Sequence, residues 1–470
     1  MSYVMSRRTL LRGSLGVAAA GTIAGLTSAG AAEAAPIRTD AEVYGVPTVN
    51  PLITQRADPF ITPRTNGMYY FTGSVPEYDR IALRGASTIA GLGSAPETVI
   101  WRRPASGKMA GHIWAPELHR IDGRWYVYFA AGDSDNVFRI RTYVLESSRA
   151  DPLDAAGWAL KGQIIMEWDD FTLDATTFAH CGRRYLVWAQ GEPEIAVNTS
   201  LYIARMANPW TLATKPTRIT TPTKSWEIPG FKVNEGPAVL IRNGRIFMTY
   251  SAAATDARYC MGLLTADADA DLLDRASWRK SPDPIFVTNA ETQRYGPGHN
   301  SFTVAEDGKT DVLVYHARDY RDITGDPLYD PNRHTRVQRL YWHPDGTPMF
   351  GVPVGDGGPI VRISPANKPV DFVRHTADGS LAIEKAPYDL AATQFRFATQ
   401  ADGTESIRSV DHPGKFVRVD GAAVRLDATA TGFRRVTERT GIRLQAGTGY
   451  LAVSGGALTV NGSGTVFRLS

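Results

Sequence analysis

Residues 233–250 have the sequence VNEGPAVLIRNGRIFMTY, which contains in order an acid, a backbone corner and a hairpin. Glu235 precedes Gly236, which permits backbone angles closed to other residues, and Pro237, whose ring fixes its own φ. A hydrophobic strand at 238–241, an Asn-Gly turn and a second strand follow. Asn-Gly between two hydrophobic runs is a strong hairpin signal. The stretch therefore predicts a carboxylate held on a defined corner at the start of a hairpin.

This hairpin unit recurs along the chain at intervals of about sixty residues. Each copy has a turn glycine and then a strand rich in Val, Ile, Tyr, Trp or Phe, as is typical of strands buried between sheets. The turn glycines are Gly67, Gly123, Gly182, Gly244 and Gly308, and the strands after them lie at 68–71, 125–129, 185–188, 246–250 and 312–315. Several short strands per unit, in five units, predict an all-β protein with a five-bladed β-propeller.

Ionisable residues recur at one position of this repeat, about nine residues before each turn glycine. In a propeller these positions meet at one mouth of the central channel, because the first strand of each blade lines it. They hold Asp58, the neighbourhood of Glu117, Asp174, Glu235 and His299. Ionisable groups are costly to bury at the start of an apolar strand. Three carboxylates in register therefore indicate a functional site, the alternative being that each is separately solvated or paired.

Five ordered motifs carry a resemblance to a known family. They are RADPF at 56–60, WAPEL at 114–118, LDATTF at 173–178, NEGP at 234–237 and GPGHN at 296–300. Together they resemble glycoside hydrolase family 43, whose fold is the five-bladed propeller, over roughly residues 45–360. The segments VPEYDR at 75–80 and YHAR at 315–318 are most similar to its exo-acting 1,5-α-L-arabinofuranosidases. The resemblance implies a propeller domain at 36–360.

The resemblance implies an inverting hydrolase with Asp58 as general base, Glu235 as general acid and Asp174 as a third carboxylate that raises the pKa of the acid. Inversion needs two carboxyl groups about 6.5 to 9.5 Å apart, a gap that opposite blades can supply. A nearby carboxylate disfavours ionisation of its neighbour. The implied substrates are arabinan and arabino-oligosaccharides. The alternatives are an arabinofuranosidase or β-xylosidase acting on arabinoxylan, and a propeller that binds sugar without cleaving it.

The resemblance also implies residues around the reacting bond. Trp114 and Tyr78 are expected to bind substrate, although Trp114 has the alternative of packing under the second blade. Arg318 is expected beside them as a counter-charge to Asp174. His299 would hold an ion or water cluster on the propeller axis, or else simply close the fifth blade through hydrogen bonds. Catalysis requires no cofactor, and any ion at His299 would be calcium or another hard cation, since one imidazole makes no zinc site.

A second, shorter repeat follows a connector rich in Gly and Pro. Three units of about thirty-five residues contain matching strands near 372–374, 416–418 and 450–452, and predict a β-trefoil at 361–470. This tail resembles carbohydrate-binding module family 42, which implies arabinofuranose binding through His375, Asp389 and Asp427. The matching histidine is replaced in the other two units, by Val419 in the second and by Val453 or Ser454 in the third. The alternative is a structural domain that no longer binds sugar.

Composition and the amino terminus predict a secreted protein. The formal net charge of +3 over 470 residues, with no basic run in the body of the chain, gives no reason to expect a nucleic-acid partner. Residues 6–11, SRRTLL, resemble a twin-arginine export signal, and Ala32 and Ala34 fit a cleavage site that ends a signal at 1–35. No later segment reaches eighteen apolar residues, so no membrane association is expected. A monomer is expected, and the two cysteines leave pairing open.

Overall fold

The computed structural model describes residues 49–470. The predicted export signal at 1–35 lies outside the described residues. No helix within 49–470 combines the length and the apolar character that crossing a membrane requires. Nearly all regular structure in this range is β-strand, which confirms the all-β prediction.

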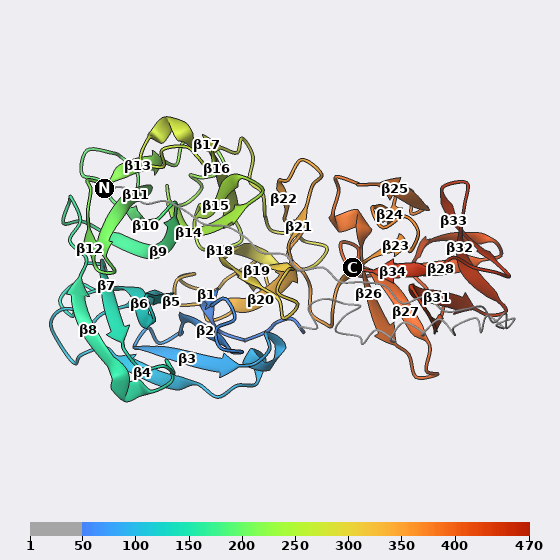
Figure 1. The fold of residues 1–470 in the computed structure, drawn as a ribbon, viewed down its shortest axis with the longest axis horizontal. Helices are drawn as coiled ribbons and strands as arrows, with labels where there is room; N and C mark the ends of the chain where they lie inside the picture. Colours follow the sequence, from blue (N-terminus) through green and yellow to red (C-terminus); the bar gives the residue numbers. More distant parts are fainter. Residues whose placement is uncertain (1–48) are drawn as a thin grey trace, which may run out of the picture. The chain divides into compact units, whose positions relative to one another are not determined.

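Five sheets follow one another in sequence order around a common centre (Figure 1). Blade one has β1 (Ala57–Ile61), β2 (Tyr69–Ser74), β3 (Arg80–Ala86) and β4 (Thr98–Arg102). Blade two has β5 (Ile113–Ile121), β6 (Arg124–Ala131), β7 (Arg141–Ser147) and β8 (Trp158–Gln163). Blade three has β9 (Thr172–His180), β10 (Arg183–Gln190), β11 (Ser200–Asn208), β12 (Thr211–Leu212) and β13 (Thr217–Thr220). Blade four has β14 (Asn234–Arg242), β15 (Arg245–Ala252), β16 (Cys260–Asp267) and β17 (Arg279–Lys280). Blade five has β18 (Tyr295–Val304), β19 (Asp311–Arg318) and β20 (His334–Arg339).

The blades pair their strands antiparallel, and short elements complete the propeller. A two-stranded ribbon of β21 (Tyr341–Trp342) and β22 (Pro348–Met349) follows blade five. Three 3-10 helices lie between strands, namely η1 (Ala90–Gly93), η2 (Ala155–Gly157) and η3 (Arg275–Ser277). The order of sheets confirms the predicted five-bladed propeller.

The predicted turn glycines do join the first two strands of each blade. In blades one, two, three and four the residue before the glycine also has positive φ, as a two-residue hairpin of type I′ requires. These pairs are Asn66–Gly67, Asp122–Gly123, Cys181–Gly182 and Asn243–Gly244. In blade five only Gly308 has positive φ, at 68°, and its loop is longer. The turn glycines in the sequence therefore identified the first hairpin of each blade correctly.

The innermost strands share a second feature, a bulge near their amino ends. Strands β1, β5, β9, β14 and β18 pack side by side in a ring around the centre. In each of them the ladder shifts register near its start, next to a residue in the left-handed region. The residues at this position are Asp58, Ala115, Asp174, Gly236 and His299. The bulge interrupts the alternation of side chains between the two faces of each strand. All five bulges lie at the same end of the ring.

Apolar side chains fill the spaces between neighbouring sheets. One cluster contains Trp125 with strands of blades one and two, and another contains Trp188 with strands of blades two and three. Both indole rings are almost fully buried. Each such side chain contributes about 1.5 to 3 kcal/mol or more on burial. This inter-blade packing holds the inner strands at fixed positions.

Residues after the propeller form a separate set of twelve strands, coloured orange to red in Figure 1. They are β23 (Val361–Pro365), β24 (Asp371–His375), β25 (Leu381–Lys385), β26 (Gln394–Thr399), β27 (Glu405–Ser409), β28 (Phe416–Asp420), β29 (Ala423–Asp427), β30 (Arg434–Glu438), β31 (Gly441–Ala446), β32 (Gly449–Ser454), β33 (Ala457–Asn461) and β34 (Phe467–Leu469), with the 3-10 helix η4 (Ala391–Thr393). Three groups of four strands are what the predicted three-unit trefoil requires. Their buried Phe395, Phe433 and Phe467 occupy one core.

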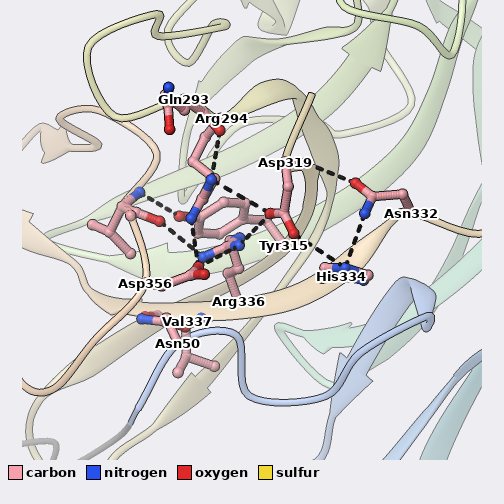
Figure 2. Close-up of polar contacts among 12 residues, drawn as sticks. Asn50, Gln293, Arg294, Tyr315, Asp319, Asn332, His334, Arg336, Val337 and Asp356 are labelled. Atoms are coloured by element: carbon pink, nitrogen blue, oxygen red, sulfur yellow. Dashed lines mark hydrogen bonds and ion pairs between the residues drawn. The ribbon is translucent and has the colours of Figure 1, made fainter. Parts of the chain in front are cut away.

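A network of charges around two buried arginines attaches the connector after the propeller to blade five (Figure 2). The Arg336 guanidinium contacts Asp319 at 2.7 Å and Asp356 at 2.8 Å, and Arg294 contacts Asp356 at 2.5 Å. Arg336 is fully buried, so both carboxylates compensate a charge that water does not reach. Asn50 adds backbone hydrogen bonds to the connector residue Gly357. The connector is thus part of the packing of the last blade.

Candidate active site

A cavity of about 700 Å³ opens where the bulged ends of the inner strands meet. It is lined by Asp58, Asp174, Glu235 and His299, four of the residues that the repeat placed in register. Aromatic side chains form much of the remaining wall, namely Tyr78, Trp114, Phe138, Phe171, Phe231 and Tyr259. Carboxyl groups within an aromatic wall are suited to a carbohydrate, whose hydroxyls bind to polar groups and whose ring faces pack on apolar surface.

Asp58 is held as a carboxylate. Ser74 Oγ donates to its Oδ2 at 2.5 Å, and Arg333 Nη1 lies 3.6 Å from its Oδ1. Burial disfavours the charged form, but the charges of His299 and Arg333 and the Ser74 hydrogen bond outweigh it and lower the pKa of Asp58 to about 2. Asp58 is therefore ionised at every pH at which the protein is expected to work.

Glu235 is held as a carboxylic acid. Burial and the charge of Asp174 raise its pKa to about 8, against a hydrogen bond from Tyr259 Oη at 2.7 Å that favours ionisation. The pKa of Asp174 is also raised, by burial first and by the charge of Asp58, although the charge of His299 and the amide of Gly236 oppose this. The Gly236 amide donates to Asp174 Oδ2 at 2.9 Å and so joins the corner after Glu235 to the third acid.

His299 lies between two of the acids. Its Nδ1 is 3.3 Å from Asp58 Oδ1 and 3.9 Å from Asp174 Oδ2. Burial lowers the pKa of this imidazole, but the charges of Asp174 and Asp58 outweigh burial and raise it. The two carboxylates therefore favour the protonated form of the ring, which pairs with both of them. The structure therefore gives His299 an ion-pairing role, and a metal ion at this residue stays a prediction.

His316, in contrast, is neutral. Its Nδ1 accepts the backbone amide hydrogen of Asp58 at 3.1 Å, so this nitrogen carries no proton. Burial lowers its pKa well below the usual value. The ring of Tyr259 stacks on it with an interplanar angle of 6°. His316 thus fixes the backbone at Asp58 and the ring of the tyrosine that contacts Glu235.

Two of the three predicted substrate-binding residues lie in the cavity wall. Tyr78 and Trp114 pack edge to face with ring centroids 5.8 Å apart, and both are largely buried. Trp114 also packs with Ala130 and Ile140 of blade two, so it both lines the cavity and contributes to the core. Arg318 is placed differently: its guanidinium binds Asp330 at 2.5 Å and not Asp174. It supports the loop after β19.

Glu117 does not line the cavity, although its charge acts on Asp174 and His299. Ala115 occupies the bulge position of blade two, two residues before Glu117. Glu117 Oε2 instead contacts His119 Nε2 at 2.8 Å within the same strand. Counting back nine residues from the turn glycine gives only the approximate position, because the bulges lie eight or nine residues before it.

Sequence reasoning missed four residues that contact the acids, namely Ser74, Tyr259, His316 and Arg333. Ser74 ends β2, Tyr259 directly precedes β16, and Arg333 lies in the loop before β20. None of them occupies the repeated position of the innermost strand. Ser74 ends a second strand and Tyr259 precedes a third, so a pattern read only along the innermost strands does not find them.

In the C-terminal domain Asp389 lies near enough to His375 to act on it electrostatically, whereas Asp427 belongs to the second unit, and sugar binding by these residues stays a prediction. His375 Nε2 contacts Asp411 at 2.9 Å, and sequence reasoning missed this aspartate. Asp389 accepts the amide hydrogen of Ala392, and Asp427 pairs with Arg425 at 3.1 Å. His375, Asp411 and His412 form a group that could hold a metal ion. Both cysteines are free, Cys181 on the surface and Cys260 in the interior.

Comparison with known proteins agrees with this geometry. The family model for glycosyl hydrolases family 43 matches residues 48–348. The chain is 58% identical over 358 residues to an extracellular exo-α-(1→5)-L-arabinofuranosidase of Streptomyces avermitilis, covering 76% of this chain and 74% of that protein. It is 53% identical to α-L-arabinofuranosidase 43 of Humicola insolens, covering 90% and 89% of the two chains.

A solved structure supports the same assignment. The crystal structure of α-L-arabinofuranosidase from Lactobacillus brevis matches with a TM-score of 0.64 and 56% identity, covering 66% of this chain and 98% of that one. The match of the family model to more than half of the chain and the identity to these relatives agree with the five bulged strands and their acids. The chain therefore belongs to glycosyl hydrolase family 43.

Proposed function

We propose that this protein is an extracellular, inverting exo-α-1,5-L-arabinofuranosidase that releases L-arabinose from arabinan and arabino-oligosaccharides. The observation that carries the proposal is the opposite protonation of two carboxyl groups in one cavity, Asp58 ionised and Glu235 protonated at neutral pH. Inverting hydrolysis requires such a base and such an acid together. The sugar and its linkage come from the relatives in Streptomyces and Humicola, whose names specify arabinofuranosides.

In the proposed reaction Asp58 takes a proton from a water molecule that attacks the anomeric carbon. Glu235 gives its proton to the glycosidic oxygen as the bond between that oxygen and the anomeric carbon breaks. The new bond forms on the face opposite the leaving group, so the configuration inverts. Asp174 acts through its charge, which keeps the proton on Glu235, and through its hydrogen bond to the Gly236 amide. These steps need no cofactor.

Exo action is supported by the loop between β19 and β20, which lies over one side of the cavity. Tyr78 Oη of blade one donates to the carbonyl of Leu328 in this loop at 2.5 Å. Tyr329 Oη is 3.2 Å from His112 Nε2 at the start of blade two. A loop from blade five that is anchored on blades one and two closes one end of the cleft. Such a cleft admits the end of a polysaccharide chain in preference to its middle.

Product analysis on linear arabinan tests this function. We expect arabinose as the product at the earliest times by chromatography, and its β-anomer first by proton NMR. A mixture of oligosaccharides would contradict exo action, and initial α-anomer would contradict inversion. Faster cleavage of 4-nitrophenyl β-xyloside than of 4-nitrophenyl α-arabinofuranoside would favour the xylosidase alternative. If the protein cleaves none of these substrates, the alternative of a propeller that only binds sugar is favoured.

Asp174→Asn is expected to move the alkaline limb of the pH profile of kcat/KM to lower pH. The charge of Asp174 raises the pKa of Glu235, so its removal lets Glu235 lose its proton at lower pH, and only the protonated form is active. The amide keeps an oxygen for the Gly236 hydrogen bond. Asp326→Asn, at a carboxylate that lines the same cavity, is the control and should leave the limb in place. An unmoved or raised limb in Asp174→Asn would contradict the role of Asp174.

The proposal includes two further parts that rest on the sequence. Export would use the twin-arginine segment at 1–35, and the extracellular relatives support this location. Arabinofuranose binding in the C-terminal domain would use His375, Asp389 and Asp427. The full-length protein and a variant that lacks residues 361–470 are passed over immobilised arabinoxylan. Stronger retention of the full-length protein measures binding by the C-terminal domain.

A further inference from the structure

Three potential metal ligands meet in the C-terminal domain, away from the acids of the propeller. His375 is the last residue of β24, and Asp411 and His412 lie in the loop between β27 and β28. One ligand atom from each residue lies within 4.8 Å of the other two. Within residues 49–470, this is the group of three His, Cys, Asp or Glu side chains that meets such spacing. The set contains two imidazoles and one carboxylate.

His375 and Asp411 are in direct contact, and the ligand atoms of all three residues lie within 4.8 Å of one another. His375 Nε2 lies 3.0 and 2.9 Å from the two oxygens of Asp411. Ligands bound to one zinc ion at about 2.0 to 2.2 Å in tetrahedral geometry are a little over 3 Å apart. The rings of His375 and His412 have centroids 5.1 Å apart. His412 is exposed, so its ring can rotate to close the remaining gap.

The surrounding residues orient this group. His375 is buried, with 8% of its surface exposed, so its ring has little freedom. Ser409 Oγ donates to Asp411 Oδ1 at 2.5 Å and accepts the backbone amide hydrogen of His412 at 3.4 Å. Hydrogen bonds of this kind from a second layer of residues fix the carboxylates and imidazoles of metal sites. One serine therefore positions both loop ligands.

We propose that His375, Asp411 and His412 form a binding site for a divalent ion of the zinc type, which would compete for His375 with the arabinofuranose binding proposed above. Two imidazole nitrogens and one carboxylate oxygen favour Zn²⁺, and also Cu²⁺ or Ni²⁺, over Ca²⁺ and Mg²⁺, which take oxygen ligands. The fourth position of a tetrahedral ion faces solvent on the side of the exposed His412. A bound ion joins β24 of the first unit to the loop that begins the second, and so stabilises this domain when the ligands are deprotonated.

Zinc titration of the mature full-length protein tests the site. The protein carries Cys181→Ser, because Cys181 Sγ lies 3.2 Å from His180 Nε2 and is a rival zinc-binding pair. After treatment with a chelator, zinc chloride is added in a calorimeter and in thermal melts. We expect one equivalent to bind, the melting temperature of the C-terminal domain to rise, and calcium chloride to produce neither effect.

His412→Ala is the decisive variant, since an exposed side chain can be removed without loss of the fold. It should weaken zinc binding at least about tenfold and abolish the rise in melting temperature, whereas His343→Ala, outside the group, should change neither. Circular dichroism and thermal melts without zinc check that both variants fold. Equal zinc affinity in His412→Ala and His343→Ala, failure of the Cys181→Ser protein to bind zinc, or equally tight calcium binding would overturn the proposal.

Discussion

The Asp58→Asn variant is expected to hydrolyse arabino-oligosaccharides about 10³-fold more slowly than the unmodified enzyme, with the fold intact. An amide cannot accept the proton of the attacking water, and general base catalysis contributes roughly 10² to 10⁴-fold. The amide keeps one oxygen, so it can retain either the Ser74 hydrogen bond made to Oδ2 or the His299 contact made to Oδ1, while its NH2 group replaces the other oxygen. Steady-state kinetics on arabinobiose measures the loss, which should fall on kcat.

Azide rescue distinguishes loss of a base from loss of a fold. Azide is a nucleophile that attacks without giving up a proton, so added sodium azide should restore turnover in Asp58→Asn and yield the glycosyl azide. Asp326→Asn, in the same cavity, should retain full activity without azide. An Asp58→Asn enzyme that keeps more than a tenth of its activity would remove Asp58 from the role of base.

The loss on replacing Glu235 is expected to depend on the leaving group. Glu235→Gln cannot donate a proton, so cleavage of arabinobiose, whose departing oxygen is a poor leaving group, should fall by about 10³-fold or more. A 2,4-dinitrophenyl arabinofuranoside releases a stable phenolate that needs no proton, and its cleavage should fall far less. The ratio of kcat/KM for the two substrates, measured in both enzymes, gives the effect.

Tyr259→Phe is the control for this second prediction. It removes the hydrogen bond from Tyr259 to Glu235 but keeps the proton donor, so it should slow both substrates to a similar, smaller extent. An equal loss on both substrates in Glu235→Gln would show that Glu235 contributes by binding or by structure and does not donate the proton.

Local chemistry explains which parts of the fold could be predicted. Turn glycines need positive φ whatever surrounds them, so Gly123 and Gly244 identified the hairpins of their blades from sequence alone. Asp58, Asp174 and His299 were found because they share one position of the repeat. The left-handed backbone of that position was not expected, since it follows from a bulge that depends on the pairing of β1, β9 and β18 with the next strand.

Contacts between distant segments explain what could not be predicted. Arg333 reaches Asp58 from a loop about 275 residues later in the chain, and no spacing rule connects the two. Arg318 was expected beside Asp174, but the course of the loop after β19 brings Asp330 closer. In the C-terminal domain His375 meets Asp411 of the next unit, because the units exchange contacts across their boundaries. Each case depends on tertiary packing.

The charge network of Figure 2 determines how far the hydrolase can be truncated from its carboxyl end. The family match ends at residue 348, before Asp356. A polypeptide that ended there would leave Arg294 and Arg336 to share Asp319 as their remaining carboxylate, with both guanidiniums in the interior. It would also lose the backbone pairing between Asn50 and Gly357. The smallest self-sufficient catalytic unit therefore extends past the segment that the family model matches, through the connector to Gly357.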